Sequence, residues 1–161
     1  MIIVSDTSPI SNLIIIDQLL ILKALYGQLI IPESVSQEVQ ALDTFGIDVS
    51  FVSKADWITV QSASDRSLVA KLAFEVDSGE AEAIALAIEL NADRLLIDER
   101  IGREVAQRYG LRITGLLGAL VSAKQNGLIS ELKPIVDQLI RQAKFRVHAD
   151  LYSQILQDVN E

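Results

Sequence analysis

The chain has 161 residues, half of them hydrophobic, and a formal net charge of −8 at pH 7. The length fits a single domain, and the acidic balance argues against a general nucleic-acid coat protein, which would be basic. There is no cysteine and only one histidine, His148, so disulfides and thiolate metal sites are excluded and a histidine-based catalytic triad is not expected.

Strand-like apolar runs alternate with helix-like segments along the chain, which predicts an α/β fold with a parallel sheet. The predicted strands cover residues 2–5, 29–31, 57–60, 94–97 and 111–114. The first predicted helix begins near Ser8, and an alanine-rich helix follows residues 77–80 and ends at residue 90. The other predicted helices cover residues 17–26, 32–42, 65–74, 102–109, 116–123, 131–143 and 149–159. Residues 44–50 are expected to form a loop.

Ser8 followed by Pro9 indicates a helix start, because serine is a good N-cap and proline suits the first helical position. We expect residues 1–161 to form one domain, with the C-terminal helices at about 130–161 as an extension for dimerisation or another interaction. The high apolar content also favours an oligomer, because obligate interfaces resemble a core cut in half.

The sequence favours a cytoplasmic protein that does not enter a membrane. No apolar run approaches the ~18–20 residues of a membrane-spanning helix. The N-terminus lacks the basic segment and the small-residue cleavage site of a signal peptide.

Four acidic residues occupy positions where an inert fold would not place them. Asp6 and Asp98 follow predicted buried strands, and Glu38 and Glu80 fall on the apolar sides of predicted helices. A buried carboxylate is costly unless it is paired or bound to a metal. In open α/β sheets, ligands bind beyond the carboxyl ends of strands, where the two aspartates would lie. Four converging carboxylates predict a site for a hard cation such as Mg²⁺ or Mn²⁺, which prefers oxygen ligands.

The periodicity of the alanine-rich helix separates Glu80 from two neighbouring glutamates. Ile84 shares the side of Glu80, whereas Glu82 and Glu89 fall on the opposite side and are expected in solvent. The structural alternative for Glu80 is a capping box with Asp77 as the N-cap. The two roles are compatible, since a helix N-terminus also favours negative charge.

Each of the other three acids also has a structural alternative. Glu38 could lie at the edge of the apolar side, with its carboxylate in water. Asp6 could initiate a turn, and Asp98 could start a helix. Ser8 is a better N-cap than Asp6, which frees Asp6 for another role; Thr7 and Ser8 would then place hydroxyl and backbone N–H groups beside it.

The segments that contain these acids resemble the PIN-domain family, the ribonuclease fold shared with VapC-type toxins. The resemblance covers about residues 1–123 and includes the Gly-Glu-Ala-Glu-Ala-Ile motif of one bacterial and archaeal branch. It is carried by Val4–Pro9, Ile31–Val39, Ser78–Ala87 and Leu95–Arg100. It implies that the four acids of the family fall on Asp6, Glu38, Glu80 and Asp98, with the small hydroxyl residue after the first acid at Thr7 and Ser8 beside it.

The chain departs from the family pattern at two points. The third acid is usually aspartate in the toxins and is Glu80 here, and the longer side chain could shift the metal or weaken the site. The strand before the fourth acid often ends with Thr or Ser, whereas Leu96 and Ile97 are apolar. Glu99 is a second candidate for the fourth position.

The resemblance implies a three-layer fold with a sheet of four or five parallel strands, in the order 3-2-1-4-5, flanked by helices. It also implies a Mg²⁺- or Mn²⁺-dependent endoribonuclease that forms a homodimer or higher oligomer, with the four acids as catalytic metal ligands. Such an enzyme could be the toxin of a toxin–antitoxin pair, with an antitoxin protein as its partner. Arg100 and Arg103 are candidate phosphate contacts, or else solvated helix arginines.

The alternative is a catalytically weak PIN-like module that acts by binding a protein partner. The net charge of −8 and the apolar composition favour this second hypothesis.

Overall fold

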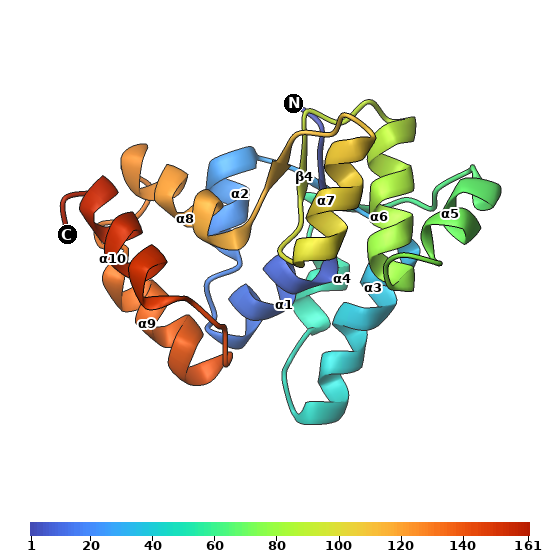
Figure 1. Ribbon diagram of the computed structural model, residues 1–161. Helices are drawn as coiled ribbons and strands as arrows, with labels where there is room; N and C mark the ends of the chain where they lie inside the picture. Colours follow the sequence, from blue (N-terminus) through green and yellow to red (C-terminus); the bar gives the residue numbers. More distant parts are fainter.

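The computed structural model describes residues 1–161 (Figure 1). At its centre is a parallel five-stranded sheet in the order β3-β2-β1-β4-β5, which confirms the expected α/β class and strand order. The strands are β1 (Ile3–Ser5), β2 (Leu29–Ile31), β3 (Ile58–Val60), β4 (Arg94–Leu96) and β5 (Ile113–Thr114).

Helices cover both faces of the sheet. They are α1 (Thr7–Ile15), α2 (Leu20–Tyr26), α3 (Glu33–Gln40), the 3₁₀ helix η1 (Ala41–Phe45), α4 (Ser50–Lys54), α5 (Arg66–Leu72), α6 (Ser78–Glu89), α7 (Arg100–Arg108), α8 (Leu116–Gln125), α9 (Lys133–Gln142) and α10 (Ala149–Asp158). Figure 1 shows α5, α6 and α7 gathered at one side of the molecule and α8, α9 and α10 at the other. None of the helices combines the length and apolarity that a membrane crossing requires.

Two hydrophobic clusters lie on the two faces of the sheet because successive strand residues point to opposite faces. Ile3 and Leu96 belong to the larger cluster, which includes residues of α1, α2, α8, α9 and α10. Val4 and Leu95 belong to the smaller cluster, which is dominated by α6. The sheet is therefore the middle of three layers.

The two central strands end at the same edge of the sheet, and an aspartate follows each of them. In β1 and β4, Val4 pairs with Leu95 and Ser5 with Leu96. The chain builds β2 and β3 on one side of β1 and then crosses to β4 on the other, so the strand order reverses between β1 and β4. Ligands of open α/β sheets bind at such a reversal, beyond the carboxyl ends of the strands. Residues 6 and 98 lie at this position.

Helix α1 begins two residues earlier than expected. Its N-cap is Asp6, not Ser8, and the Asp6 side chain makes no capping hydrogen bond. The Asp6 N–H donates to the carbonyl of Leu96 at 2.9 Å, so the β1–β4 ladder continues to residue 6 and the helix follows at once. The Asp6 carboxylate is free for another role, although for a different reason than the one predicted.

The expected loop at 44–50 is only partly correct, because η1 ends and α4 begins within it. The Asp48 carboxylate accepts hydrogen bonds from the N–H and the hydroxyl of Ser50 and so starts α4. A helix of five residues is too short to reveal a 3.6-residue period.

The C-terminal helices are packed into the larger core cluster. Leu132, Leu139 and Leu156 belong to it together with residues of α1. The Glu161 carboxylate accepts hydrogen bonds from the N–H groups of Leu132 and Lys133, which ties the end of the chain to the start of α9.

Candidate metal centre

Asp6 is a buried carboxyl group in an acidic environment. The residue is only 4% exposed. Burial raises the pKa of Asp6 to about 7; a hydrogen bond from the backbone of Thr7 opposes this rise, and the negative charges of Glu80, Asp77 and Glu38 add to it. The fold therefore brings three of the predicted acids, with Asp77 in addition, close enough to affect one another.

Glu80 lies in the first turn of α6 and is 5% exposed. Its backbone N–H donates to Asp77 Oδ1 at 2.8 Å, so the predicted N-cap is present. Its carboxylate reaches α7, where a Cβ at Gly102 would lie 3.3 Å from Glu80 Oε2. Burial raises the pKa of Glu80 to about 7, with the negative charges of Asp77 and Glu99 adding to the effect. Capping and a place in the acidic cluster coexist here.

Glu38 is exposed, as in the alternative that placed it at the edge of the apolar side with its carboxylate in water. The buried side of α3 is formed by Val35 and Val39, and Glu38 lies beside it rather than on it. Its carboxylate still points to the cluster, because Thr7 Oγ1 donates to Glu38 Oε2 at 2.5 Å. On the other side, a Cβ at Gly79 would lie 2.6 Å from Glu38 Oε1. Glu38 is thus at the solvent-facing rim of the site.

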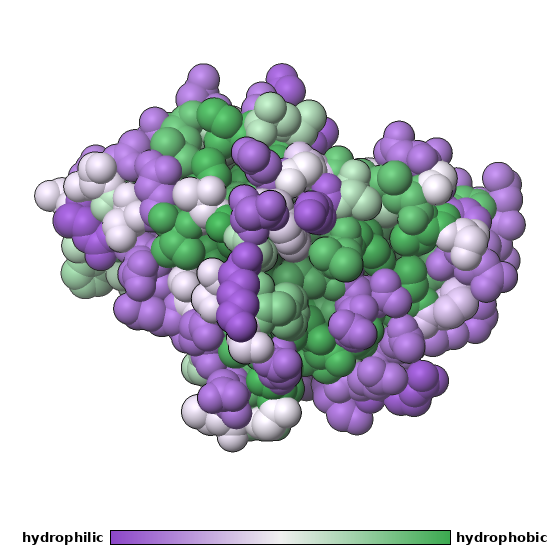
Figure 2. Space-filling model, turned by 180° about the vertical axis from the view of Figure 1, so that it is seen from behind, coloured by the Kyte–Doolittle hydropathy of each residue, from purple (hydrophilic) through white to green (hydrophobic).

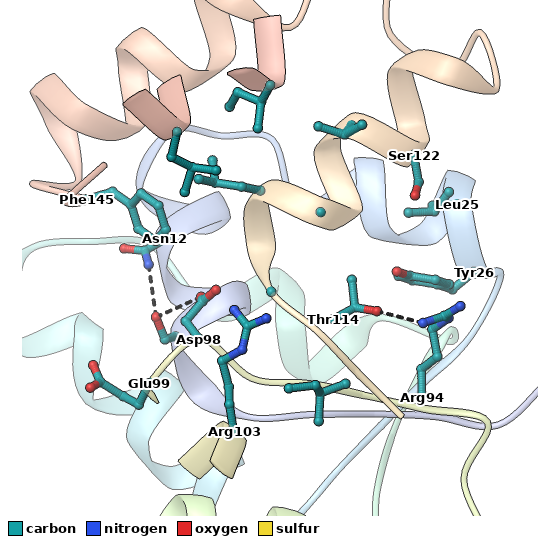
Figure 3. A pocket seen from close by; sticks show the side chains of 18 of the residues that line it. Asn12, Leu25, Tyr26, Arg94, Asp98, Glu99, Arg103, Thr114, Ser122 and Phe145 are labelled. Atoms are coloured by element: carbon teal, nitrogen blue, oxygen red, sulfur yellow. Dashed lines mark hydrogen bonds between the residues drawn. The ribbon is translucent and has the colours of Figure 1, made fainter. Parts of the chain in front are cut away.

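Asp98 is partly exposed and binds the start of α8, not that of α7. Its carboxylate accepts from the Leu116 N–H at 2.8 Å and from the Ser8 hydroxyl at 3.3 Å, and Asn12 donates to the Ser8 oxygen at 3.1 Å (Figure 3). The N-cap of α7 is Glu99. Burial raises the pKa of Asp98, while the hydrogen bonds from Leu116 and Ser8 oppose the rise.

The two candidate phosphate-binding arginines have different environments. Arg100 is 84% exposed and lies 3.9 Å from Glu104 Oε1, as a solvated helix arginine would. Arg103 is partly buried, and a Cβ at Gly115 would lie 3.0 Å from Arg103 Nη1 and 3.1 Å from Asp98 Oδ1. The absence of a side chain at Gly115 lets this arginine lie near the acidic site.

Glu82 is buried, which makes its predicted exposure wrong. It is 4% exposed and forms an ion pair with Arg66 at 2.6 Å. The N–H of Ser34 in α3 also donates to it, at 3.3 Å. Residues Gly79–Ala87 of α6 are all buried, so this helix has no wet side over that length. Only Glu89 is exposed as expected.

Sequence reasoning overlooked two residues of the site. Asp77 was considered only as a cap, yet its charge acts on both Asp6 and Glu80. Asn12 supports Ser8 from one helical turn further on, and the four-residue spacing within α1 was the available signal.

The donor chemistry of the cluster fits a hard divalent cation, although the acids are not arranged as a closed coordination shell. No group of three or more Asp, Glu or His side chains lies at metal-binding distances. Asp6 and Glu80, however, are buried carboxyl groups without a cationic side chain within ion-pair distance. Burial and the negative charges of neighbouring acids raise the pKa of both. A cation bound between them would remove that repulsion with the oxygen ligands that Mg²⁺ and Mn²⁺ prefer.

A family model described as a PIN domain matches residues 2–161. This match extends the resemblance from about residue 123 to the end of the chain. No curated protein matches this sequence.

Proposed function

This chain belongs to the PIN-domain family, a nuclease fold, and we propose that it is a divalent-metal-dependent endoribonuclease that hydrolyses RNA phosphodiester bonds. The observation that carries the proposal is the Asp6 carboxyl group. It is buried at the end of a central strand, has no cationic partner, and lies in the field of three further acids. The buried Glu82 has the opposite arrangement, since Arg66 neutralises it.

We assign Asp6, Glu38, Glu80 and Asp98 as the side chains that would hold Mg²⁺ or Mn²⁺. Such an ion supplies charge stabilisation at a phosphoryl oxygen and lowers the pKa of water. Thr7 orients the carboxylate of Glu38 by hydrogen bonding, and Ser8 orients that of Asp98. Because these hydrogen bonds hold the two carboxylates in place, the side chains would need less rearrangement when a cation binds.

Two groups are suited to the phosphate of the substrate. Arg103 lies beside Asp98 and can donate to phosphate oxygens through its planar guanidinium. Helix α1 begins at Thr7, next to Asp6, and the positive end of its dipole favours an anion there. Both would hold a phosphodiester at the acidic cluster.

The second candidate function is a binding module with little or no catalysis. It is favoured by large apolar side chains in solvent, because Phe74 is 92% exposed, Phe45 79% and Leu20 68%. Figure 2 shows hydrophobic residues spread over the face opposite to that of Figure 1. The same exposed apolar side chains are the basis for proposing a homodimer and, if the protein is a ribonuclease toxin, an antitoxin partner.

The test is cleavage of single-stranded and structured RNA by the purified protein with Mg²⁺, Mn²⁺ or EDTA. Asp6→Asn and Glu80→Gln are expected to reduce cleavage to the EDTA level, and Glu89→Gln, an exposed change on the same helix as Glu80, to leave it intact. Calorimetry should show weaker Mn²⁺ binding in the first two variants only. Cleavage that survives both substitutions would overturn the assignment, and absence of both cleavage and metal binding would favour the binding module.

A further inference from the structure

A groove extends from the acidic site along the edge of the sheet. It has a volume of about 1140 Å³ and is lined at one end by Asp98 and at the other by Arg94, the residues that follow and begin β4. Its walls come from β5, α2, α8, α10 and residues 143–146 between α9 and α10. We call this feature the edge groove (Figure 3).

The edge groove is more basic than the rest of the molecule. Four cationic side chains line it, Arg94, Arg103, Lys144 and Arg146, and none of them forms an ion pair. The acidic side chains that line it are Asp98, Glu99 and Asp158, the first two at the metal-binding end. In all, four cations and three acids line the edge groove, in a chain whose net charge is −8.

Two aromatic rings lie in the edge groove. Figure 3 shows Phe145 on the side of Asn12 and Asp98, and Tyr26 on the side of Arg94. Phe145 is half-buried and follows Lys144, whose φ of 57° turns the chain after α9. The Phe145 N–H donates to the carbonyl of Leu139 at 3.0 Å, which fixes the backbone that carries the ring. A basic groove with aromatic rings is the usual arrangement for binding single-stranded nucleic acid, because bases stack on the rings.

We propose that the edge groove binds single-stranded RNA and leads it to the acidic site, with Phe145 as a stacking surface and Arg94 and Arg146 as phosphate contacts. Only the reaction at the Asp98 end depends on the proposed ribonuclease function. A duplex would fit poorly, because its bases are stacked internally and are not available to Phe145. Because its cationic side chains have no ion-pair partners, the edge groove favours a polyanion such as RNA over an apolar protein segment.

The test measures fluorescence anisotropy of a 5′-labelled uridine 12-mer with the full chain and Ca²⁺ in place of Mn²⁺, over a range of salt concentrations. Arg146→Glu is expected to raise Kd at least about tenfold and to reduce the salt dependence by about one phosphate contact. Phe145→Ala should raise Kd about tenfold with little change in salt dependence. Lys71→Glu, the same charge change at an exposed unpaired lysine on α5, should leave Kd unchanged.

The outcomes separate this inference from the ribonuclease proposal. A Kd that neither Arg146→Glu nor Phe145→Ala alters, in variants whose urea unfolding matches the parent, would overturn the RNA path even if the protein cleaves RNA. Equal affinity for a duplex, or no RNA binding by the parent, would also overturn it; the latter would point to a protein segment in the groove. Weakened binding in both variants of a protein that cleaves nothing would support the RNA path and contradict only the nuclease.

Discussion

Replacement of Asp6 by Asn should stabilise the metal-free protein while it removes metal-dependent activity. The pKa of Asp6 in the folded protein is raised from 3.8 to about 7. Folding therefore takes up a proton between about pH 4 and pH 7, and the free energy of unfolding falls as the pH rises through this range. Above pH 7 the Asp6 carboxylate is ionised in the folded protein, where burial and the neighbouring acids make this charge unfavourable.

The size of the effect follows from the difference between the two pKa values. The change from 3.8 to about 7 corresponds to about 4 kcal/mol at pH 8. This is an upper value, because part of it comes from the charge of Glu80, whose own pKa is raised to about 7. Asparagine keeps the shape of the side chain and carries no charge, so Asp6→Asn should recover about 1–4 kcal/mol at pH 8 and almost nothing at pH 4.

The assay is urea unfolding in EDTA at pH 4.5 and pH 8, repeated at pH 8 with Mn²⁺. Mn²⁺ should stabilise the parent and leave Asp6→Asn nearly unchanged, because only the parent keeps all four of the proposed ligands. Asp48→Asn is the control with opposite sign: hydrogen bonds from Ser50 lower the pKa of Asp48, so its carboxylate stabilises the fold at pH 8 and the substitution should weaken it. If Asp6→Asn and the parent show the same pH dependence, the reasoning is refuted.

Two further pairs of substitutions test the packing around the site. Gly79→Ala places a methyl group 2.6 Å from Glu38 Oε1, so calorimetric Mn²⁺ affinity should fall at least about fivefold; Gly118→Ala, with its nearest contact at 3.4 Å, should leave it unchanged and stabilise α8 by up to about 1 kcal/mol. Glu82→Ala removes a buried carboxylate and leaves its partners unpaired, so urea unfolding should show a loss of about 1–3 kcal/mol. Glu89→Ala removes an exposed carboxylate that accepts from the Ser64 N–H and should cost less than Glu82→Ala. Equal losses for the two glutamates would contradict the burial of Glu82.

The positions of Asp6 and Asp98 could be predicted because they depend on local sequence and on one general rule. Each follows a short apolar run that can only be a buried strand, and the rule places ligands beyond the carboxyl ends of such strands. Once β1 and β4 are neighbours, both residues must lie at the same edge of the sheet. Their place required no knowledge of side-chain packing.

The three helical glutamates were harder to place. A helical wheel assumes one buried and one wet side, and that assumption fails for α6, which is buried along Gly79–Ala87, so Glu82 was placed wrongly. Glu38 lies next to the buried side of an eight-residue helix, where a wheel cannot define the edge within one residue. Its contact with Thr7 depends on how α3 packs against α1, which local sequence does not encode.

The sequence by itself determined the α/β class, the two aspartates at the strand ends and the acidic character of the candidate site, because strand burial acts over short stretches of chain. The strand order was implied by the family resemblance. Only the tertiary structure decided that Asp77 joins the cluster, that Glu82 is neutralised by Arg66, and that Arg94 and Arg146 line one groove. These relations join residues of different elements, and they arise when helices pack on the sheet. The charge of each side chain can be read from the sequence, whereas the side chain that it contacts depends on how the whole chain folds.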